Sequence, residues 1–194
     1  MKISKIDFPY NGISVVSKEQ FEAHKRLYDG YVNKTNEITD LLANDAGRVE
    51  ANSIYSKYRG LKQGETFAID GVILHELYFE NIGNNNSQPG NLTKKLIENG
   101  FLNFKNWEKD FIACAKASRG WSILIYEQRT QSLRNISLDS HNLGNIVYMI
   151  PFIVLDMYEH AYFLDYQDNK VKYIENFLKD INWNVVEERI KNII

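Results

Sequence analysis

Cysteine is almost absent from this chain of 194 residues, and no long apolar run is present. The single Cys114 excludes an intramolecular disulfide and is compatible with a reducing cytoplasm. The apolar stretch 145–155 contains Pro151 and is shorter than the roughly 20 residues of a membrane span. The first twelve residues lack the apolar region of a secretory signal. We therefore expect a cytoplasmic protein without a membrane segment.

An excess of basic residues is also missing, since 23 lysines and arginines face 25 aspartates and glutamates. No general electrostatic surface for nucleic acid is expected from this balance. Apolar residues make up 44% of the chain, which is typical of a globular domain that can bury a sizeable core.

Histidine occurs only four times, and all four residues can be assigned to one metal centre: His24, His75, His141 and His160. Asp156 stands four residues before His160, a spacing that places both side chains on one face of a helix. Imidazole and carboxylate ligands together favour a redox metal such as iron or manganese over thiolate-preferring ions.

Each of these residues also has a plain structural interpretation. His24 and His75 lie on apolar helix faces and could be satisfied core residues, while Asp156 and His160 could form an exposed helix pair. Each interpretation is reasonable alone, but together they require three histidines and an aspartate to lie in apolar contexts for unrelated reasons, and a carboxylate buried without a partner is costly. A shared cation removes that cost.

Apolar spacing predicts a helical N-terminal half. Long helices are expected over 17–44 and 66–82, with weaker helix or loop at 45–63. Ser17 is the expected N-cap of the first helix, and Gln20 completes a capping box.

The clearest linker is the Asn- and Gly-rich segment 84–90. It separates a predicted N-terminal α-helical hairpin domain, 1–83, from a C-terminal domain, 91–194. The second domain is expected to have helices around a three-stranded antiparallel sheet, so the fold class is α+β. Its helices are predicted at 91–98, 103–117, 157–165 and 170–191, and its strands at 121–127, 133–138 and about 149–155.

The segment 155–166, LDMYEHAYFLDY, resembles the D-x-W-E-H-A-Y-Y-x-D-Y signature of iron/manganese superoxide dismutases, with two aromatic departures. The helix that ends in YVNKTNEI, the segment HELYFEN at 75–81 and SRGW at 118–121 are similar to other family motifs, so the resemblance covers nearly the whole chain. It implies one iron or manganese ion per subunit. The implied ligands are His24, His75, Asp156 and His160.

The resemblance also implies roles for His141 and Tyr31. One branch of the family takes a glutamine from four residues before the second ligand, where this chain has Gly71. The other branch takes glutamine or histidine from the loop after the second strand, here LDSHNLG at 138–144. His141 is therefore the expected partner of the solvent ligand, which tunes the metal, although an ordinary loop histidine remains the alternative. A histidine at this position slightly favours iron, or a protein that can use either iron or manganese. Tyr31 is the expected gateway tyrosine, seven residues after His24 where eight is usual.

An aromatic wall around the metal is implied as well, formed by Trp121 with Phe79 and Tyr158 in place of the usual tryptophans. Core packing accounts for the same three residues. Tyr28 and Phe163 stand where many relatives carry a histidine and a tyrosine that form a hydrogen bond across the dimer interface. Both residues of that bond are absent here, so the resemblance implies that the entrance to the metal, the gate, is built differently.

Glu159 resembles the family glutamate that reaches the ligand histidine across the two-fold axis, which implies at least a dimer and leaves a tetramer open. An exposed helix glutamate is the alternative. Lys170 and Lys172 stand where relatives carry an arginine beside the substrate funnel. They could steer an anion, or form a solvated helix end.

The function implied by the resemblance is disproportionation of superoxide to dioxygen and hydrogen peroxide, with the metal cycling between +3 and +2. Two alternatives stay open. The altered gate favours a family member that binds metal but turns over little, as a reservoir or structural protein. A helical interaction protein with histidines in its core would instead contain no stoichiometric metal.

Overall fold

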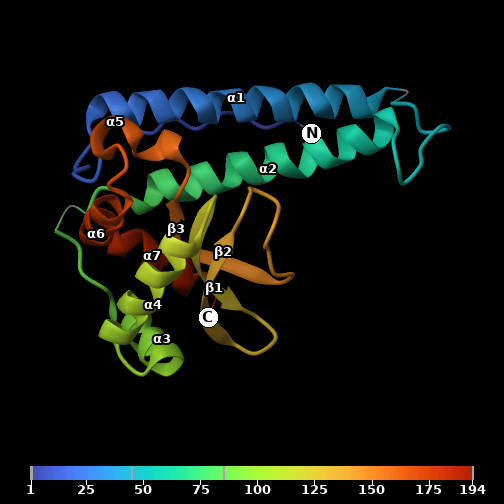
Figure 1. The fold of residues 1–194 in the computed structure, drawn as a ribbon. Coiled ribbons are helices and arrows are strands. Elements are labelled where there is room, and N and C mark those ends of the chain that lie inside the picture. Colours follow the sequence, from blue (N-terminus) through green and yellow to red (C-terminus); the bar gives the residue numbers. More distant parts are fainter. Residues whose placement is uncertain (1, 45, 85, 194) are drawn as a thin grey trace.

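The computed structural model describes residues 2–44, 46–84 and 86–193, and it confirms the predicted α+β class. Asn85 of the predicted linker, and Met1 and Ile194 at the ends of the predicted domains, lie outside the described residues. A long helical hairpin lies across a second part that combines helices with a three-stranded sheet (Figure 1). The elements are α1 (Lys18–Ala43), α2 (Lys57–Asn81), α3 (Asn91–Phe101), α4 (Phe104–Ala117), β1 (Trp121–Glu127), β2 (Ser132–Leu138), β3 (Met149–Asp156), the 3-10 helix η1 (Glu159–Ala161), α5 (Phe163–Tyr166), α6 (Lys170–Asp180) and α7 (Trp183–Lys191).

Helix α1 begins where predicted, because the Ser17 hydroxyl accepts a hydrogen bond from the backbone N–H of Gln20. The expected capping box is wrong in its second half. The Gln20 side chain donates to the carbonyl of His160 at 2.6 Å and accepts from the N–H of Leu164 at 2.9 Å. Gln20 therefore fastens the η1 region to α1.

Helix α2 begins at Lys57, earlier than the predicted start at 66, because the Ser56 side chain caps it. Gly60 and Gly64 lie inside the helix. A β-carbon at Gly64 would come within 3.3 Å of Ile38 on α1, so this glycine lets the two helices approach closely. This first part of α2, within the segment predicted as weaker helix or loop, belongs to the end of the hairpin that projects beyond the sheet (Figure 1).

The antiparallel sheet has the strand order β2-β1-β3. Trp121, the first residue of β1, is paired with Leu138 at the end of β2 and with Asp156 at the end of β3. This register gathers Trp121, Asp156 and the loop after β2 at one end of the sheet. Asn81 of α2 joins the hairpin to β3 by accepting from Val154 N–H at 2.8 Å.

The predicted helices after β3 are only partly correct. Within 157–165 the structure has the short η1 followed by the start of α5. The helix predicted over 170–191 is two helices, α6 and α7, which are separated at Ile181 and Asn182. The helix is interrupted there because the backbone N–H of Asn182 donates to the carbonyl of Asn81 at 2.7 Å instead of to a carbonyl in its own helix. This bond holds the turn against the end of α2.

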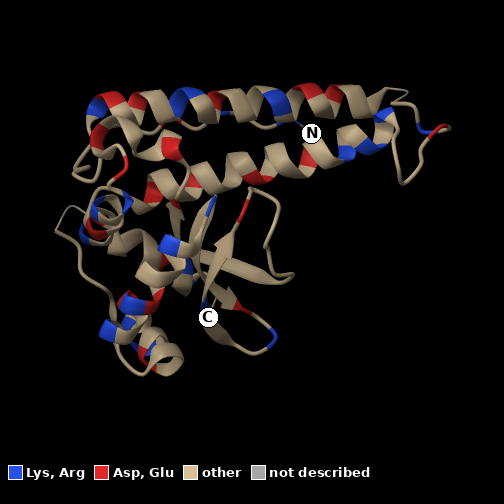
Figure 2. Ribbon diagram, in the orientation of Figure 1, with Lys and Arg blue, Asp and Glu red and all other residues tan. Residues whose placement is uncertain are grey.

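One hydrophobic core extends from α1 and α2 into the sheet and α6, so it is continuous through both predicted domains. The domain boundaries stay a prediction. Lysines and arginines are interspersed with aspartates and glutamates along the hairpin (Figure 2). Within the described ranges, no helix is both long and apolar enough to span a membrane.

Candidate metal centre

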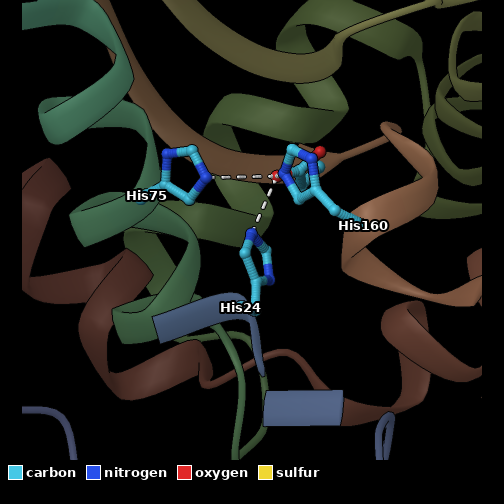
Figure 3. A group of neighbouring side chains, drawn as sticks. His24, His75 and His160 are labelled. Atoms are coloured by element: carbon cyan, nitrogen blue, oxygen red, sulfur yellow. Dashed lines mark hydrogen bonds and ion pairs between the residues drawn. The ribbon is translucent and has the colours of Figure 1, made fainter. Parts of the chain in front are cut away.

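Four side chains from four elements meet where the hairpin lies against the end of the sheet. His24 comes from α1, His75 from α2, Asp156 from the end of β3 and His160 from η1. One donor atom of each lies within 4.8 Å of all the others. Asp156 Oδ2 is 3.0 Å from His24 Nε2, 3.1 Å from His160 Nε2 and 3.7 Å from His75 Nε2 (Figure 3).

The predicted helical relation between Asp156 and His160 is wrong. Asp156 ends a strand, and the chain then turns into η1. The backbone N–H of Tyr158 donates to Asp156 Oδ1 at 2.9 Å, which leaves Oδ2 turned toward the histidines. A strand end followed by a tight turn brings the two residues together as well as a helix does.

The donor set fits a cation. His75 Nδ1–H donates to the carbonyl of Gly71 at 2.5 Å, so the neutral ring carries its lone pair on Nε2. That Nε2 atom is buried and has no hydrogen-bond partner in the described part of the chain. Donors about 2.1 Å from a shared ion lie about 3.0–3.6 Å apart at angles of about 90–120°. The distances around Asp156 Oδ2 are of this size.

The electrostatics leave the set ready to bind a cation. Burial lowers the pKa of His75 to about 3 and also lowers the pKa of His24, so both rings stay neutral. Burial alone would raise the pKa of Asp156, but His160 and His24 outweigh it and hold that pKa well below its usual value. Burial alone would lower the pKa of His160, but Asp156 outweighs it and raises that pKa. The centre therefore presents an anionic carboxylate and two neutral imidazoles, and a cation that binds His160 would displace its proton.

A hydrogen-bonded chain approaches the same four residues. Trp121 Nε1–H donates to His141 Nδ1 at 2.9 Å, and His141 Nε2 is 2.8 Å from the hydroxyl of Tyr31. Because an indole can only donate, His141 Nδ1 must accept, and its proton must be on Nε2. His141 therefore donates to Tyr31. The Tyr31 O–H proton is therefore not used in the bond to His141. The Tyr31 ring lies 5.2 Å from the ring of His75.

Comparison with known proteins agrees with this geometry. Residues 89–189 match the family model described as the C-terminal domain of iron/manganese superoxide dismutases. The chain is 44% identical to a protein of Aquifex aeolicus named superoxide dismutase [Fe], over 91% of this chain and 84% of that one. The chain belongs to the iron/manganese superoxide dismutase family.

Two more relatives differ in the metal that their names give. An enzyme of Methanothermobacter thermautotrophicus named superoxide dismutase [Fe] is 30% identical over 100% of this chain and 96% of its own. An Aeropyrum pernix relative named superoxide dismutase [Mn/Fe] is 26% identical, over 100% and 92% respectively.

The predicted wall residues surround the four donors of this family member. The Phe79 ring lies 5.0 Å from that of His24, and the Trp121 ring lies 5.1 Å from that of His75. The Tyr158 ring stacks on His160 at 5.2 Å. These contacts place a largely apolar surround around the donors, and the assignment of individual roles stays a prediction.

The hydroxyl of Tyr28 has both of its hydrogen-bond partners within the same chain. This buried hydroxyl donates to Glu76 at 2.8 Å and accepts from the N–H of Ile6 at 2.9 Å. Phe163 is half exposed and Glu159 is exposed. Their predicted roles at a dimer interface of the family stay predictions.

The side chain of His160 is 25% exposed, while the other three predicted ligands are buried. A surface cavity of about 450 Å³ is lined there by His160, Tyr158, Arg119 and Lys170, among others. Lys170 Nζ donates to the carbonyl of Ser118 at 2.8 Å. Sequence reasoning named Lys172, which is exposed and outside this lining, and missed Arg119.

Gln20 was also missed as a site residue. It lies four residues before His24 and is buried, so a polar side chain on the buried face of α1 was the available signal. Its link to the His160 carbonyl fixes η1 relative to the first helix.

Proposed function

We propose that this chain is a superoxide dismutase that holds one iron or manganese ion per subunit. The observation that carries the proposal is the set of three imidazole nitrogens and one carboxylate oxygen within 4.8 Å of one another, from three buried residues and the partly exposed His160. The names of the relatives support the same activity and both metals. The ligands in this proposal are His24, His75, Asp156 and His160.

When bound, iron or manganese supplies the one-electron chemistry, alternating between +3 and +2 while one superoxide becomes dioxygen and a second becomes hydrogen peroxide with two protons. The protein must then admit a small anion and supply protons. Arg119 and Lys170 place positive charge beside the cavity at His160, which favours the approach of an anion.

The chain Trp121–His141–Tyr31 holds a proton donor in place. His141 donates to the Tyr31 oxygen, so the Tyr31 O–H is directed to another acceptor. Burial raises the pKa of Tyr31, which keeps the phenol protonated at neutral pH. A phenol that is held protonated beside the ligand His75 is suited to protonate a peroxide product, and the indole of Trp121 keeps the donor in one orientation.

The proposal extends to a homodimer in the cytoplasm. Glu159 and Phe163 are exposed beside the ligand His160, as residues that meet a second subunit would be. The single cysteine is compatible with a reducing compartment. A native preparation should therefore sediment as a dimer, and a tetramer would require a second contact surface.

The test is metal content and superoxide dismutation measured on one native preparation, repeated after loading with iron alone and with manganese alone. We expect about one metal ion per chain and activity that follows one of the two metals. A His75→Ala variant should lose both metal and activity. Full metal content with negligible activity in both loaded forms would overturn the proposal and support a storage or structural role.

A further inference from the structure

The loop after β2 contains one buried side chain in an otherwise exposed stretch. His141 is 1% exposed, whereas residues 142–148 are all exposed. An exposed connecting segment without regular structure is normally among the more mobile parts of a domain. The position of the imidazole therefore depends on what fastens this segment to its surroundings.

Two side-chain amides of the loop bond to one face of α2. Asn142 Nδ2 donates to Thr66 Oγ1 at 2.8 Å, and Asn145 Nδ2 donates to Asp70 Oδ2 at 3.1 Å. Thr66 and Asp70 are four residues apart, so they lie on the same side of the helix. Asn145 Nδ2 also lies 3.4 Å from the carbonyl oxygen of His141, which links the bond on Asp70 directly to the histidine backbone.

An aromatic contact and a tight turn complete the attachment. The ring of Phe67, between Thr66 and Asp70 in sequence, lies 4.5 Å from the ring of His141. Gly144 has φ +112°, and a β-carbon there would meet the carbonyl oxygen of Ser137 at 2.8 Å. Only glycine fits this turn, which returns the loop toward β2 between the two asparagines.

We propose that the pairs Asn145–Asp70 and Asn142–Thr66 position His141 by fastening the loop to α2. The ring of His141 has one hydrogen-bond partner on β1, Trp121, and one on α1, Tyr31. The two asparagine bonds supply the third side, from the helix that also carries His75. This inference rests on the proposed function, because it gives the His141–Tyr31 contact a role in turnover.

The experiment compares Asp70→Ala and Asn145→Ala with the control Asp110→Ala in the iron-loaded protein. Asp110 is exposed and accepts from Asn135 Nδ2 at 2.8 Å, so the control removes the same kind of bond away from the histidine. The readouts are kcat per bound iron, the dissociation constant of azide as a small anion, the visible absorption band of the iron and the thermal midpoint. The exchange Asp70→Asn with Asn145→Asp reverses donor and acceptor and tests for rescue.

We expect a three- to tenfold loss of kcat per bound iron in both single variants, with a changed azide dissociation constant and a shifted absorption band. The control should match the unaltered protein, and the exchanged pair should recover most of the loss. Unchanged kcat, azide binding and absorption in both single variants would overturn the inference. If the unaltered protein has no dismutase activity, the proposed function fails, and azide binding and absorption still decide whether these pairs position His141.

Discussion

Gly71 of α2 and Tyr31 of α1 are matched in size: a β-carbon at position 71 would lie 2.9 Å from Cδ1 of the tyrosine ring. Real β-carbons essentially never come so close to another heavy atom, so the ring can occupy this place only because the helix carries glycine there. The absence of a side chain on α2 is thus what allows Tyr31 to reach His141.

Replacing Gly71 by alanine should displace the Tyr31 ring and break its hydrogen bond to His141. We expect at least a tenfold loss of kcat per bound metal, with a stability cost of about 1–3 kcal/mol from overpacking. The matched control is Gly60→Ala, because nothing lies within 4 Å of a β-carbon there. In a helix interior that change should stabilise by about 0.5–1 kcal/mol and leave kcat unaltered. Equal kcat values in the two variants would contradict the prediction.

Changing Trp121 to phenylalanine should leave the tautomer of His141 no longer fixed, because Nδ1 of the histidine loses the indole N–H that donates to it. An unpaired buried acceptor costs about 1–3 kcal/mol, so a comparable fall in stability is expected together with a lower kcat. Trp107 offers a control: its Nε1 atom is buried and has no partner among the described residues. Trp107→Phe should therefore lower the free energy of unfolding only through lost packing contacts, and kcat per bound metal should stay unchanged. Urea unfolding and steady-state kinetics on both variants decide the point.

Acid should weaken the fold through His141. Burial lowers the pKa of this residue to about 4 in the folded protein, against about 6.5 in an unfolded chain. The unfolded state thus binds the extra proton first as the pH falls. The stabilisation is fully present above about pH 6.5 and is lost progressively as the pH falls through 4, about 3 kcal/mol in total.

The measurement for this effect is the urea midpoint against pH for the unaltered protein and for His141→Gln. The difference between the two free energies of unfolding should shrink as the pH falls from 7 to 4, because glutamine has no proton to gain. A difference that stays constant over this interval would show that His141 does not contribute the slope.

Removing the metal should lower stability by linkage, because only the folded chain brings the four donors together. At a free metal concentration of 1,000 times the dissociation constant the stabilisation is about 4 kcal/mol. Differential scanning calorimetry with and without a chelator should show a fall in the thermal midpoint. His75→Ala should unfold at the same temperature with and without chelator, since Nε2 of this histidine is lost. A chelator effect of full size in that variant would rule out His75 as a ligand.

The sequence was informative where a residue type is rare or a local signal is strong. Four histidines in the whole chain made His24, His75 and His160 conspicuous, and the structure brings these three together. The spacing of Asp156 and His160 was read as helical, although a strand end and a turn give the same proximity. Four residues of separation do not distinguish the two geometries.

Other features carried no local signal. Gln20 fulfils the spacing of a capping box, yet its side chain bonds to residues far along the chain, at His160 and Leu164. The contacts of Asn142 and Asn145 with α2 also join residues that are distant in sequence. Such bonds depend on how the hairpin lies against the sheet, and no periodicity records that.

The burial of three of the four donors links the formation of the site to the folding of the chain. His24, His75 and Asp156 are closed off from solvent and come from both ends of the chain, so the site exists only after the hairpin and the sheet have docked. Folding and ligand assembly are thus one event: the complete donor set exists only in the docked chain, and His160, the one donor with a partly exposed side chain, is where the folded site faces solvent.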